Sequence, residues 1–226
     1  LEEKMGLITL AMTMAYRGGV NYSQVFGTTA IWDAIIHRQL QERNMVVPPR
    51  KDSIKVKYPG AYVKDPQVGM HNWVASFDLA SLYPNLIIQY NMSPETVHDV
   101  LPGVNVDTFL NNRIIPPELY REDLTLSASG LRFTNAKQGV IPAIVEQYFN
   151  ERKEIKGRMI KCKQEYEESP SKRLENEINS LENQQMSLKI LMNSLYGAMG
   201  NAYFRYFDSR VAEAITTSGQ LAIRYA

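Results

Sequence analysis

Residues 76–85, SFDLASLYPN, have the side-chain types and spacing most suited to chemistry. They follow the apolar run 73–75, so we expect a buried strand that ends at the carboxylate of Asp78. The chain then turns at once into a segment that carries Ser81 and Tyr83. An acid at the end of a strand, followed directly by backbone amides, can hold a metal ion beside a phosphate group.

A simpler role for Asp78 is structural. Its side chain can cap the next helix, with Ser81 at the third helical position. Capping aspartates are far more common than aspartates that bind metals, so these ten residues alone favour the cap. The rest of the chain has to decide between the two roles.

The composition sets limits on the class of protein. The 226 residues are 44% hydrophobic and 22% charged, which is typical of a globular protein that buries a core. The net charge of +1 means that any surface for nucleic acid must be local. Cys162 is the single cysteine, which excludes an internal disulfide and fits a reducing compartment.

No apolar run approaches the roughly 20 residues of a membrane span, and no signal peptide is recognisable.

The chain starts without methionine and stops inside a helical pattern, so we expect a fragment. Apolar spacing predicts a first helix over residues 1–15, stopped by Gly18 and its neighbour. Thr28 opens a second helix that ends near Asn44, with Trp32 as a core residue.

Prolines between residues 45 and 70 forbid a long helix and predict a boundary or connector, with a strand over 61–64. A short helix should then continue to about Asn91. Alternating apolar residues around Gly130 predict a β-hairpin, in which Arg132 is a solvated strand residue rather than a phosphate ligand.

Two long apolar patterns give the clearest prediction. They cover residues 139–168 and 171–196, and the second alternates spacings of four and three, with Gln185 filling a gap. The break at Pro170 is short and is followed by a capping serine, Ser171. We therefore expect two helices that pack antiparallel as a hairpin.

The hairpin should bring cations together near its base. Arg152 and Lys189 both lie roughly 27–29 Å from the tip at about 1.5 Å per residue. Lys156 is one turn from Arg152, while Asn193 and Tyr196 share a face with Lys189. Three cations and an amide in one place suit a triphosphate.

The alternative is that Lys156 and Lys189 are solvated and that Arg152 pairs with Glu151 or Glu154. For any one of these three residues the alternative is favoured. It explains less well why Arg152 and Lys189 are expected at the same distance from the tip of the hairpin.

The last part of the chain is less informative. Glycines within 196–200 should end the second long helix. The aromatic residues of 203–207 should be buried in a strand, and Asp208 or Ser209 should cap a final helix that runs through Ile223.

Two of these stretches together resemble family B DNA polymerases. SFDLASLYP resembles the first polymerase motif, Asp-x-x-Ser-Leu-Tyr-Pro, and KILMNSLYG resembles the second, Lys-x-x-x-Asn-Ser-x-Tyr-Gly. The segments YPGAYVKDP, NMSPET, FNERKEIKG and GNAYFRYFD most resemble the replicative polymerases of T-even-type bacteriophages. The resemblance covers nearly the whole chain and outweighs a role of Asp78 as a cap alone.

The resemblance implies a DNA-directed DNA polymerase that acts in DNA replication. A primer 3′-hydroxyl attacks the α-phosphate of a deoxynucleoside triphosphate, with two Mg²⁺ ions about 3.5–4 Å apart. The implied partners are primer–template DNA, deoxynucleoside triphosphates and a sliding clamp bound through a region outside this sequence. The implied location is the cytoplasm of an infected bacterial host, without a membrane.

The resemblance also assigns roles to residues. Asp78 is one of two carboxylates that bridge the metal ions, and the Leu79 carbonyl adds a ligand. Tyr83 lies under the sugar and rejects ribonucleotides, because its ring occupies the space that a 2′-hydroxyl needs. The implied triphosphate ligands are the backbone amides of Ser81, Leu82 and Tyr83 and the side chains of Arg152, Lys156, Lys189 and Asn193. Tyr196 and Gly197 line the minor-groove side of the nascent base pair.

The implied fold class is α+β, a partial polymerase palm of mixed strands and helices with a long antiparallel helical hairpin as fingers. Residues 1–50 are the tail of an exonuclease region with connecting helices, and 51–139 are the first part of the palm. Residues 140–197 are the fingers, and 198–226 return into the palm.

The chain departs from the family pattern at several points. Asn85 stands where the family usually has serine, and the fingers are shorter than in the best-known phage examples. No exonuclease metal cluster is found near the start. The second metal-binding carboxylate lies in an Asp-Thr-Asp turn in the family, and Asp107, Asp123 and Asp208 are not in such a turn. We therefore expect the 226-residue chain alone to be inactive.

Two other classes are considered. A non-enzymatic scaffold could bind a partner helix along the seam from Leu174 to Leu195, but it gives no reason for the identities of Asp78, Tyr83 and Asn193. An ATP-binding enzyme of another type should carry a GxxxxGK loop, which this sequence lacks.

Overall fold

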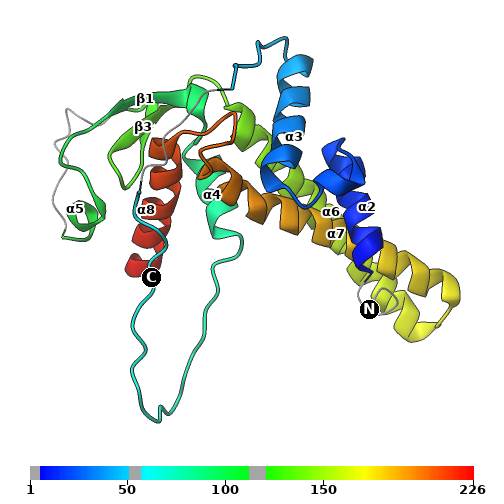
Figure 1. Ribbon diagram of the computed structural model, residues 1–226. Coiled ribbons are helices and arrows are strands. Elements are labelled where there is room, and N and C mark those ends of the chain that lie inside the picture. Colours follow the sequence, from blue (N-terminus) through cyan, green and yellow to red (C-terminus); the bar gives the residue numbers. More distant parts are fainter. Residues whose placement is uncertain (1–5, 51–56, 112–120) are drawn as a thin grey trace. The chain divides into compact units, whose positions relative to one another are not determined.

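A computed structural model describes residues 6–50, 57–111 and 121–226 (Figure 1). The chain divides into two compact units, each assembled from separate parts of the sequence. The first unit comprises Leu1–Lys55 and Val140–Asp208, and the second comprises Val56–Gly139 and Ser209–Ala226. In the described residues no helix combines the length and apolar character needed to cross a membrane.

The helical hairpin dominates the first unit, as predicted. Helix α6 spans Val140–Glu168 and α7 spans Lys172–Met199, and the two lie side by side in Figure 1. The Oγ of Ser171 accepts a hydrogen bond from the Leu174 amide at 3.3 Å, which is the predicted cap. Every seventh residue of α7 is a leucine that is at most 7% exposed, namely Leu174, Leu181, Leu188 and Leu195. The seam is therefore covered within the unit.

Two shorter helices pack on this hairpin. Helix α2 spans Leu7–Gly18 and α3 spans Thr28–Glu42, with the 3₁₀ turn η1 (Tyr22–Gln24) between them. Gly19 ends α2 in the left-handed region at φ 66°, where glycine carries little strain. Trp32 is fully buried, and its Nε1 lies 3.1 Å from both the Leu191 carbonyl and the Ser194 Oγ. Trp32 is a core residue, as predicted, and it ties α3 to α7.

The aromatic segment after α7 is buried in part, but it is not a strand. Phe204 and Tyr206 are at most 9% exposed, whereas Tyr203 is 90% exposed. The backbone makes two turns, and in the first of them the Phe204 amide donates a hydrogen bond to the Asn201 carbonyl at 2.9 Å. The Arg205 Nε donates to the Oδ1 of Asp33 at 2.7 Å, and this ion pair holds the turns against α3. The strand prediction is wrong because the backbone groups pair locally instead of along a ladder.

The second unit contains a small antiparallel sheet. Strands β1 (Val97–Val100), β2 (Leu124–Leu126) and β3 (Leu131–Thr134) lie in the order β1-β3-β2. The predicted hairpin is the β2–β3 pair, whose turn contains Gly130 at φ 81°. Arg132 is paired with Asp99 on β1 and has a side chain only 11% exposed, so it is not the solvated residue that was predicted.

Helices surround this sheet. They are α4 (Leu82–Gln89), α5 (Val106–Leu110) and α8 (Ser209–Tyr225), and the 3₁₀ turn η2 spans Pro94–Thr96. Helix α8 packs against α4, α5 and β3. Its Thr216 Oγ1 donates to the Pro59 carbonyl at 2.8 Å, and its Gln220 Nε2 donates to the Gly60 carbonyl at 2.6 Å. The start of α8 at Ser209 agrees with the prediction.

Residues 57–81 contain neither helix nor strand and run as a long extended loop (Figure 1). The exposed fraction is 101% at Trp73 and 92% at Phe77. The predicted strands over 61–64 and before Asp78 are therefore wrong. A strand needs a neighbour that takes up its backbone hydrogen bonds, and the described strands pair only with one another.

Taken together, the described residues are mostly helical with one three-stranded antiparallel sheet. This is the predicted α+β class with a long helical hairpin.

Candidate functional site

Asp78 is exposed and lies three residues before Ser81, the residue that precedes α4. No described residue forms a hydrogen bond or ion pair with its carboxylate. Asp78 is not the helix cap, because that position belongs to Ser81 at φ 53°, whose side chain makes no capping bond. The carboxylate is thus accessible to a ligand.

Asn85 has a clear local function. Its Nδ2 donates to the Ala80 carbonyl at 2.9 Å, and its backbone amide bonds to the Ser81 carbonyl at 3.0 Å. These bonds fix the turn that joins the Asp78 segment to α4. The asparagine therefore replaces the usual serine with a side chain that makes its own backbone contact.

Leu82 and Tyr83 form the first turn of α4, where backbone amides have no intrahelical acceptor and carry partial positive charge. Tyr83 is half-buried, and burial raises the pKa of its hydroxyl, so the phenol is neutral at physiological pH. Leu79, by contrast, is 47% exposed and lies in the irregular segment.

Arg152 projects from α6 onto α7. It is half-buried, and its Nε donates to the Oε1 of Gln185 at 3.2 Å. Gln185 in turn donates to Glu182 at 2.8 Å. The alternative in which Arg152 pairs with Glu151 is wrong, because Glu151 binds Arg17 at 2.7 Å. Within the described residues no carboxylate neutralises Arg152.

The remaining predicted cations and the amide lie on the same two helices as this arginine. Gln185 and Lys189 are one helical turn apart on the same face of α7, about 6 Å along the axis. The hydrogen bond between Arg152 and Gln185 therefore brings the arginine side chain to α7 one turn before Lys189. Lys156, Lys189 and Asn193 are exposed, and none has a partner among the described residues.

Tyr196 and Gly197 lie near the end of α7. Tyr196 is half-buried and Gly197 is exposed. The helix continues to Met199 and ends at Gly200, so Gly197 is inside the helix rather than at its end. A Cβ on Gly197 would meet nothing within 4 Å, so packing within the described chain does not require glycine there.

The predicted site residues thus fall into two groups. Asp78, Leu79 and residues 81–83 belong to the second unit, and the hairpin residues belong to the first. Each group is assembled within its own unit.

The donor set for a metal is incomplete. The Asp78 carboxylate and the Leu79 carbonyl are oxygen donors, which suit Mg²⁺. Among the described residues no cluster of three or more His, Cys, Asp or Glu is present. Asp107 is paired with Arg224 at 3.1 Å and Asp123 with Arg121 at 2.8 Å, so these two acids serve as ion-pair partners.

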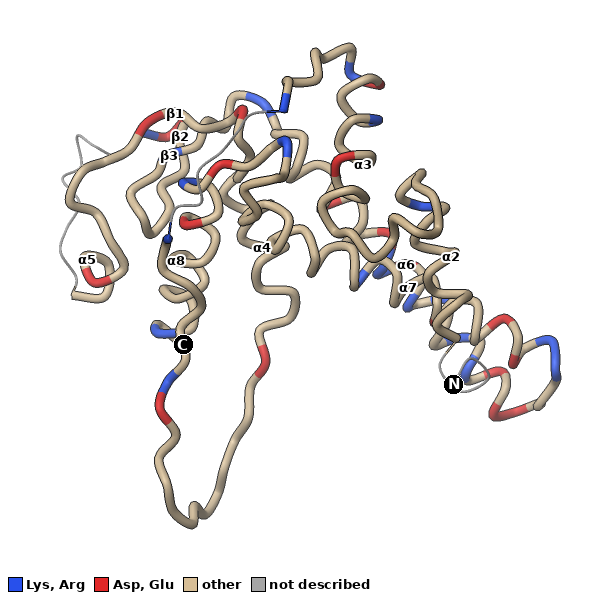
Figure 2. The backbone as a smooth tube through the Cα atoms, in the orientation of Figure 1, with Lys and Arg blue, Asp and Glu red and all other residues tan. Residues whose placement is uncertain are grey.

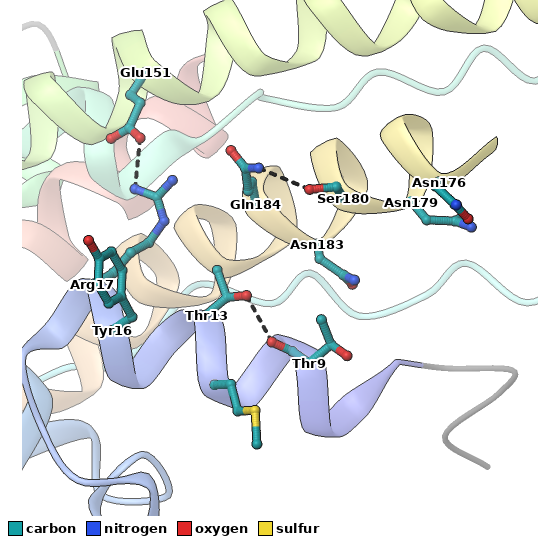
Figure 3. Close-up of a pocket in the computed structure, with 11 residues that line it drawn as sticks. Thr9, Thr13, Tyr16, Arg17, Glu151, Asn176, Asn179, Ser180, Asn183 and Gln184 are labelled. Carbon is teal, nitrogen blue, oxygen red and sulfur yellow. Dashed lines mark hydrogen bonds and ion pairs between the residues drawn. The ribbon is translucent and has the colours of Figure 1, made fainter. Parts of the chain in front are cut away.

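A cavity of about 870 Å³ lies in the first unit between α2 and α7 (Figure 3). It is lined by amides and hydroxyls, among them Thr13, Asn179 and Asn183. The only charged side chains in its lining are the paired Arg17 and Glu151. None of the predicted site residues lines it, and its neutral lining does not suit a triphosphate.

The hairpin carries charges of both signs. Figure 2 shows acidic and basic residues along both α6 and α7, in line with the net charge of +1. A triphosphate site on the hairpin must therefore depend on the few cations near the base of the hairpin. A uniformly positive surface is not present there to attract the ligand.

Comparison with known proteins identifies the family. A model of DNA polymerase family B matches residues 27–226. The chain belongs to DNA polymerase family B. This family B chain is 32% identical to the DNA-directed DNA polymerase of Escherichia phage RB69, covering 100% of the chain and 29% of that protein. It is 29% identical to the DNA-directed DNA polymerase of Enterobacteria phage T4, and this match covers 100% of the chain and 29% of that protein.

The fold agrees with the family. The family B DNA polymerase from the hyperthermophilic archaeon Pyrobaculum calidifontis matches 99% of the chain with a TM-score of 0.69 and 25% identity. The match covers 26% of that structure's chain. The resemblance to family B polymerases of T-even-type phages is confirmed, and the chain spans less than a third of the length of these relatives.

Proposed function

We propose that these residues belong to a DNA-directed DNA polymerase that adds deoxynucleotides to a primer 3′-hydroxyl during DNA replication. The observation that carries the proposal is the base of the hairpin. There Arg152, which no described carboxylate neutralises, bonds to Gln185, and Gln185 is one turn from the exposed Lys189 on α7. A half-buried arginine without a carboxylate partner suits an anionic ligand.

In this proposal each part of the chain has a polymerase role. Residues 1–50 are the tail of the exonuclease region with connecting helices, and 51–139 are the first part of the palm. Residues 140–197 are the fingers, and 198–226 return into the palm.

The proposed metal ligands are Asp78 and the Leu79 carbonyl. Two Mg²⁺ ions, when bound, would activate the primer hydroxyl and stabilise the leaving oxygens. The protein's own contribution is to present an unpaired carboxylate beside the first turn of α4. Asn85 fixes the turn between the two through its bond to the Ala80 carbonyl.

The proposed triphosphate ligands are those that the resemblance to the family assigns. The amides of Ser81, Leu82 and Tyr83 bind the β- and γ-phosphate oxygens, and the ring of Tyr83 excludes a 2′-hydroxyl. Arg152, Lys156, Lys189 and Asn193 bind the triphosphate from the fingers. Tyr196 and Gly197 line the minor-groove side of the nascent base pair, where the open space at Gly197 lets a base approach.

The proposed partners are primer–template DNA and deoxynucleoside triphosphates. A sliding clamp would bind through a region outside this sequence, and the enzyme would act in the cytoplasm of an infected bacterium. The alternative of a scaffold that binds a partner helix loses its main support, because its seam is already buried within the first unit.

Primer extension tests the proposal. The complete polymerase should extend a primer on a DNA template with deoxynucleotides and Mg²⁺, and Tyr83→Ala should relax its discrimination against ribonucleotides. The isolated 226-residue chain should not extend the primer, because it carries one of the two bridging carboxylates. Extension by the isolated chain would refute the two-carboxylate assignment, and unchanged sugar selectivity in Tyr83→Ala would refute the role of Tyr83.

A further inference from the structure

Gly219 occupies a buried position inside α8, although glycine weakens a helix interior relative to alanine. A Cβ at this position would lie 2.9 Å from Cε1 and 3.6 Å from Cδ1 of Tyr83. Side-chain Cβ atoms essentially never approach a neighbour to within 3.0 Å. The glycine is therefore required by the ring that packs on it.

The helix that carries the Tyr83 ring is anchored close to the ring. Tyr83 lies on the first turn of α4, which packs against α8. The next turn of α4 is anchored by Leu86 and Ile87, which are 7% and 2% exposed. A methyl group on Gly219 would move the ring edge from 2.9 Å to at least the 3.4 Å at which ordinary contact begins.

We propose that Gly219 is a positioning residue for Tyr83 and thereby sets the space for the nucleotide sugar. This rests on the proposed function, in which the Tyr83 ring lies under the sugar. Because α8 already covers one edge of the ring, a substrate must contact the ring from another side. In the proposed site a ring pushed away from α8 therefore changes the space that is left for the sugar.

The test is steady-state incorporation by the complete polymerase with Gly219→Ala. A displacement of about half an ångström should raise the KM for deoxynucleotides on the order of tenfold, with a smaller change in kcat. The matched control is Gly157→Ala, since Gly157 is also inside a helix and an added Cβ there meets nothing within 4 Å. The control should leave KM unchanged.

A double-mutant cycle separates positioning from a general loss of stability. In a Tyr83→Ala background the ring is absent, so Gly219→Ala should no longer change KM. An equal rise in KM in both backgrounds, or no rise in either, would overturn the inference. If Gly219→Ala alone fails to fold, Tyr83→Ala should restore its thermal transition, and a failure to restore it would also overturn the inference.

The cycle also distinguishes this inference from the proposed function. Unchanged ribonucleotide discrimination in Tyr83→Ala would remove the proposed role of Tyr83 itself. Relaxed discrimination in Tyr83→Ala together with a neutral Gly219→Ala would leave that role intact and reject only Gly219 as its determinant.

Discussion

The α6–α7 hairpin and the segment 73–83 carry the two groups of proposed site residues, but they position those residues by different means. On the hairpin, Arg152 is held by Gln185 across a buried leucine seam. Asp78 lies on exposed, irregular backbone, and only the Asn85 contacts close the turn after it. Among the proposed triphosphate ligands of the hairpin, Arg152 is thus held by a contact within its own unit, whereas no described contact holds the Asp78 carboxylate.

The difference has a physical basis. A helix satisfies its backbone hydrogen bonds within itself, so its side chains are placed by local sequence and by one packed face. An extended segment satisfies its backbone groups only through a neighbouring strand or through solvent. The predictions below test this contrast, beginning with the largest expected effect.

Hydrogen exchange in the complete polymerase should separate the two regions. Amides in the middle of α6 and α7 are hydrogen-bonded within helices, while no amide between residues 57 and 80 donates a described hydrogen bond. Without ligands we expect exchange on the order of a thousandfold or more faster in 57–80. Adding primer–template, deoxynucleotide and Mg²⁺ should slow exchange near Asp78. Equal rates in the two regions would contradict the contrast.

Asp78→Asn should lower activity strongly without affecting folding. Loss of a bridging carboxylate removes several kcal/mol of transition-state stabilisation, on the order of a thousandfold in rate. The melting temperature should not change, because the carboxylate is exposed and has no described partner. Asp65→Asn, at an exposed position of the same segment, is the matched control and should retain full activity. Comparable rates for the two variants would refute the role of Asp78.

Arg152→Ala or Lys189→Ala should weaken the use of nucleotide by about 1.5–3 kcal/mol, the value of a hydrogen bond to a charged group. This corresponds to roughly a ten- to hundredfold fall in single-turnover incorporation at low nucleotide concentration. Lys163→Ala, an exposed position nearer the tip of α6, serves as the control. The assignment fails if Arg152→Ala and Lys189→Ala both behave like Lys163→Ala.

Tyr206→Phe should have the smallest effect and only at high pH. Burial, together with the negative charge of Asp33, raises the pKa of Tyr206 from 10.0 to about 12. The folded state therefore keeps this proton more tightly than the unfolded state. This difference in pKa adds to the free energy of unfolding. The added stability is complete below about pH 10 and is lost as the pH rises toward 12.

Denaturant titrations at pH 8 and at higher pH measure this effect. Tyr206→Phe should lose less stability between the two conditions than the unmodified protein. At pH 8 it should be as stable as the unmodified protein, because the Tyr206 hydroxyl has no hydrogen-bond partner among the described residues. Tyr203→Phe, 90% exposed, should follow the unmodified protein. Identical pH profiles for all three would contradict the assignment.

The same contrast explains what could be predicted from the sequence. The hairpin followed from the apolar spacing and from Ser171, because both signals act over a few residues. Trp32 was expected in the core for the same reason. The strand before Asp78 was wrong because an apolar run indicates a strand only if a partner strand exists, and a local pattern does not contain that information.

Contacts between distant residues were also missed. Gln185 looked like a gap in an apolar seam, and only the structure shows that it binds Arg152. Gly219 had no signal at all, because its requirement comes from the ring of Tyr83 on another helix. The proposed site residues were assigned from the resemblance to the family, whereas the contacts around Arg152 and Tyr83 were found only in the structure.

The central claim is that Asp78 and the hairpin cations act on one nucleotide. A crystal structure of the complete polymerase with primer–template DNA, an incoming deoxynucleotide and Mg²⁺ tests it most directly. The account predicts an Asp78 oxygen at about 2.0–2.1 Å from a metal ion and both Arg152 and Lys189 in contact with the same triphosphate. A triphosphate that contacts neither cation, or metal ions that Asp78 does not bind, would contradict it.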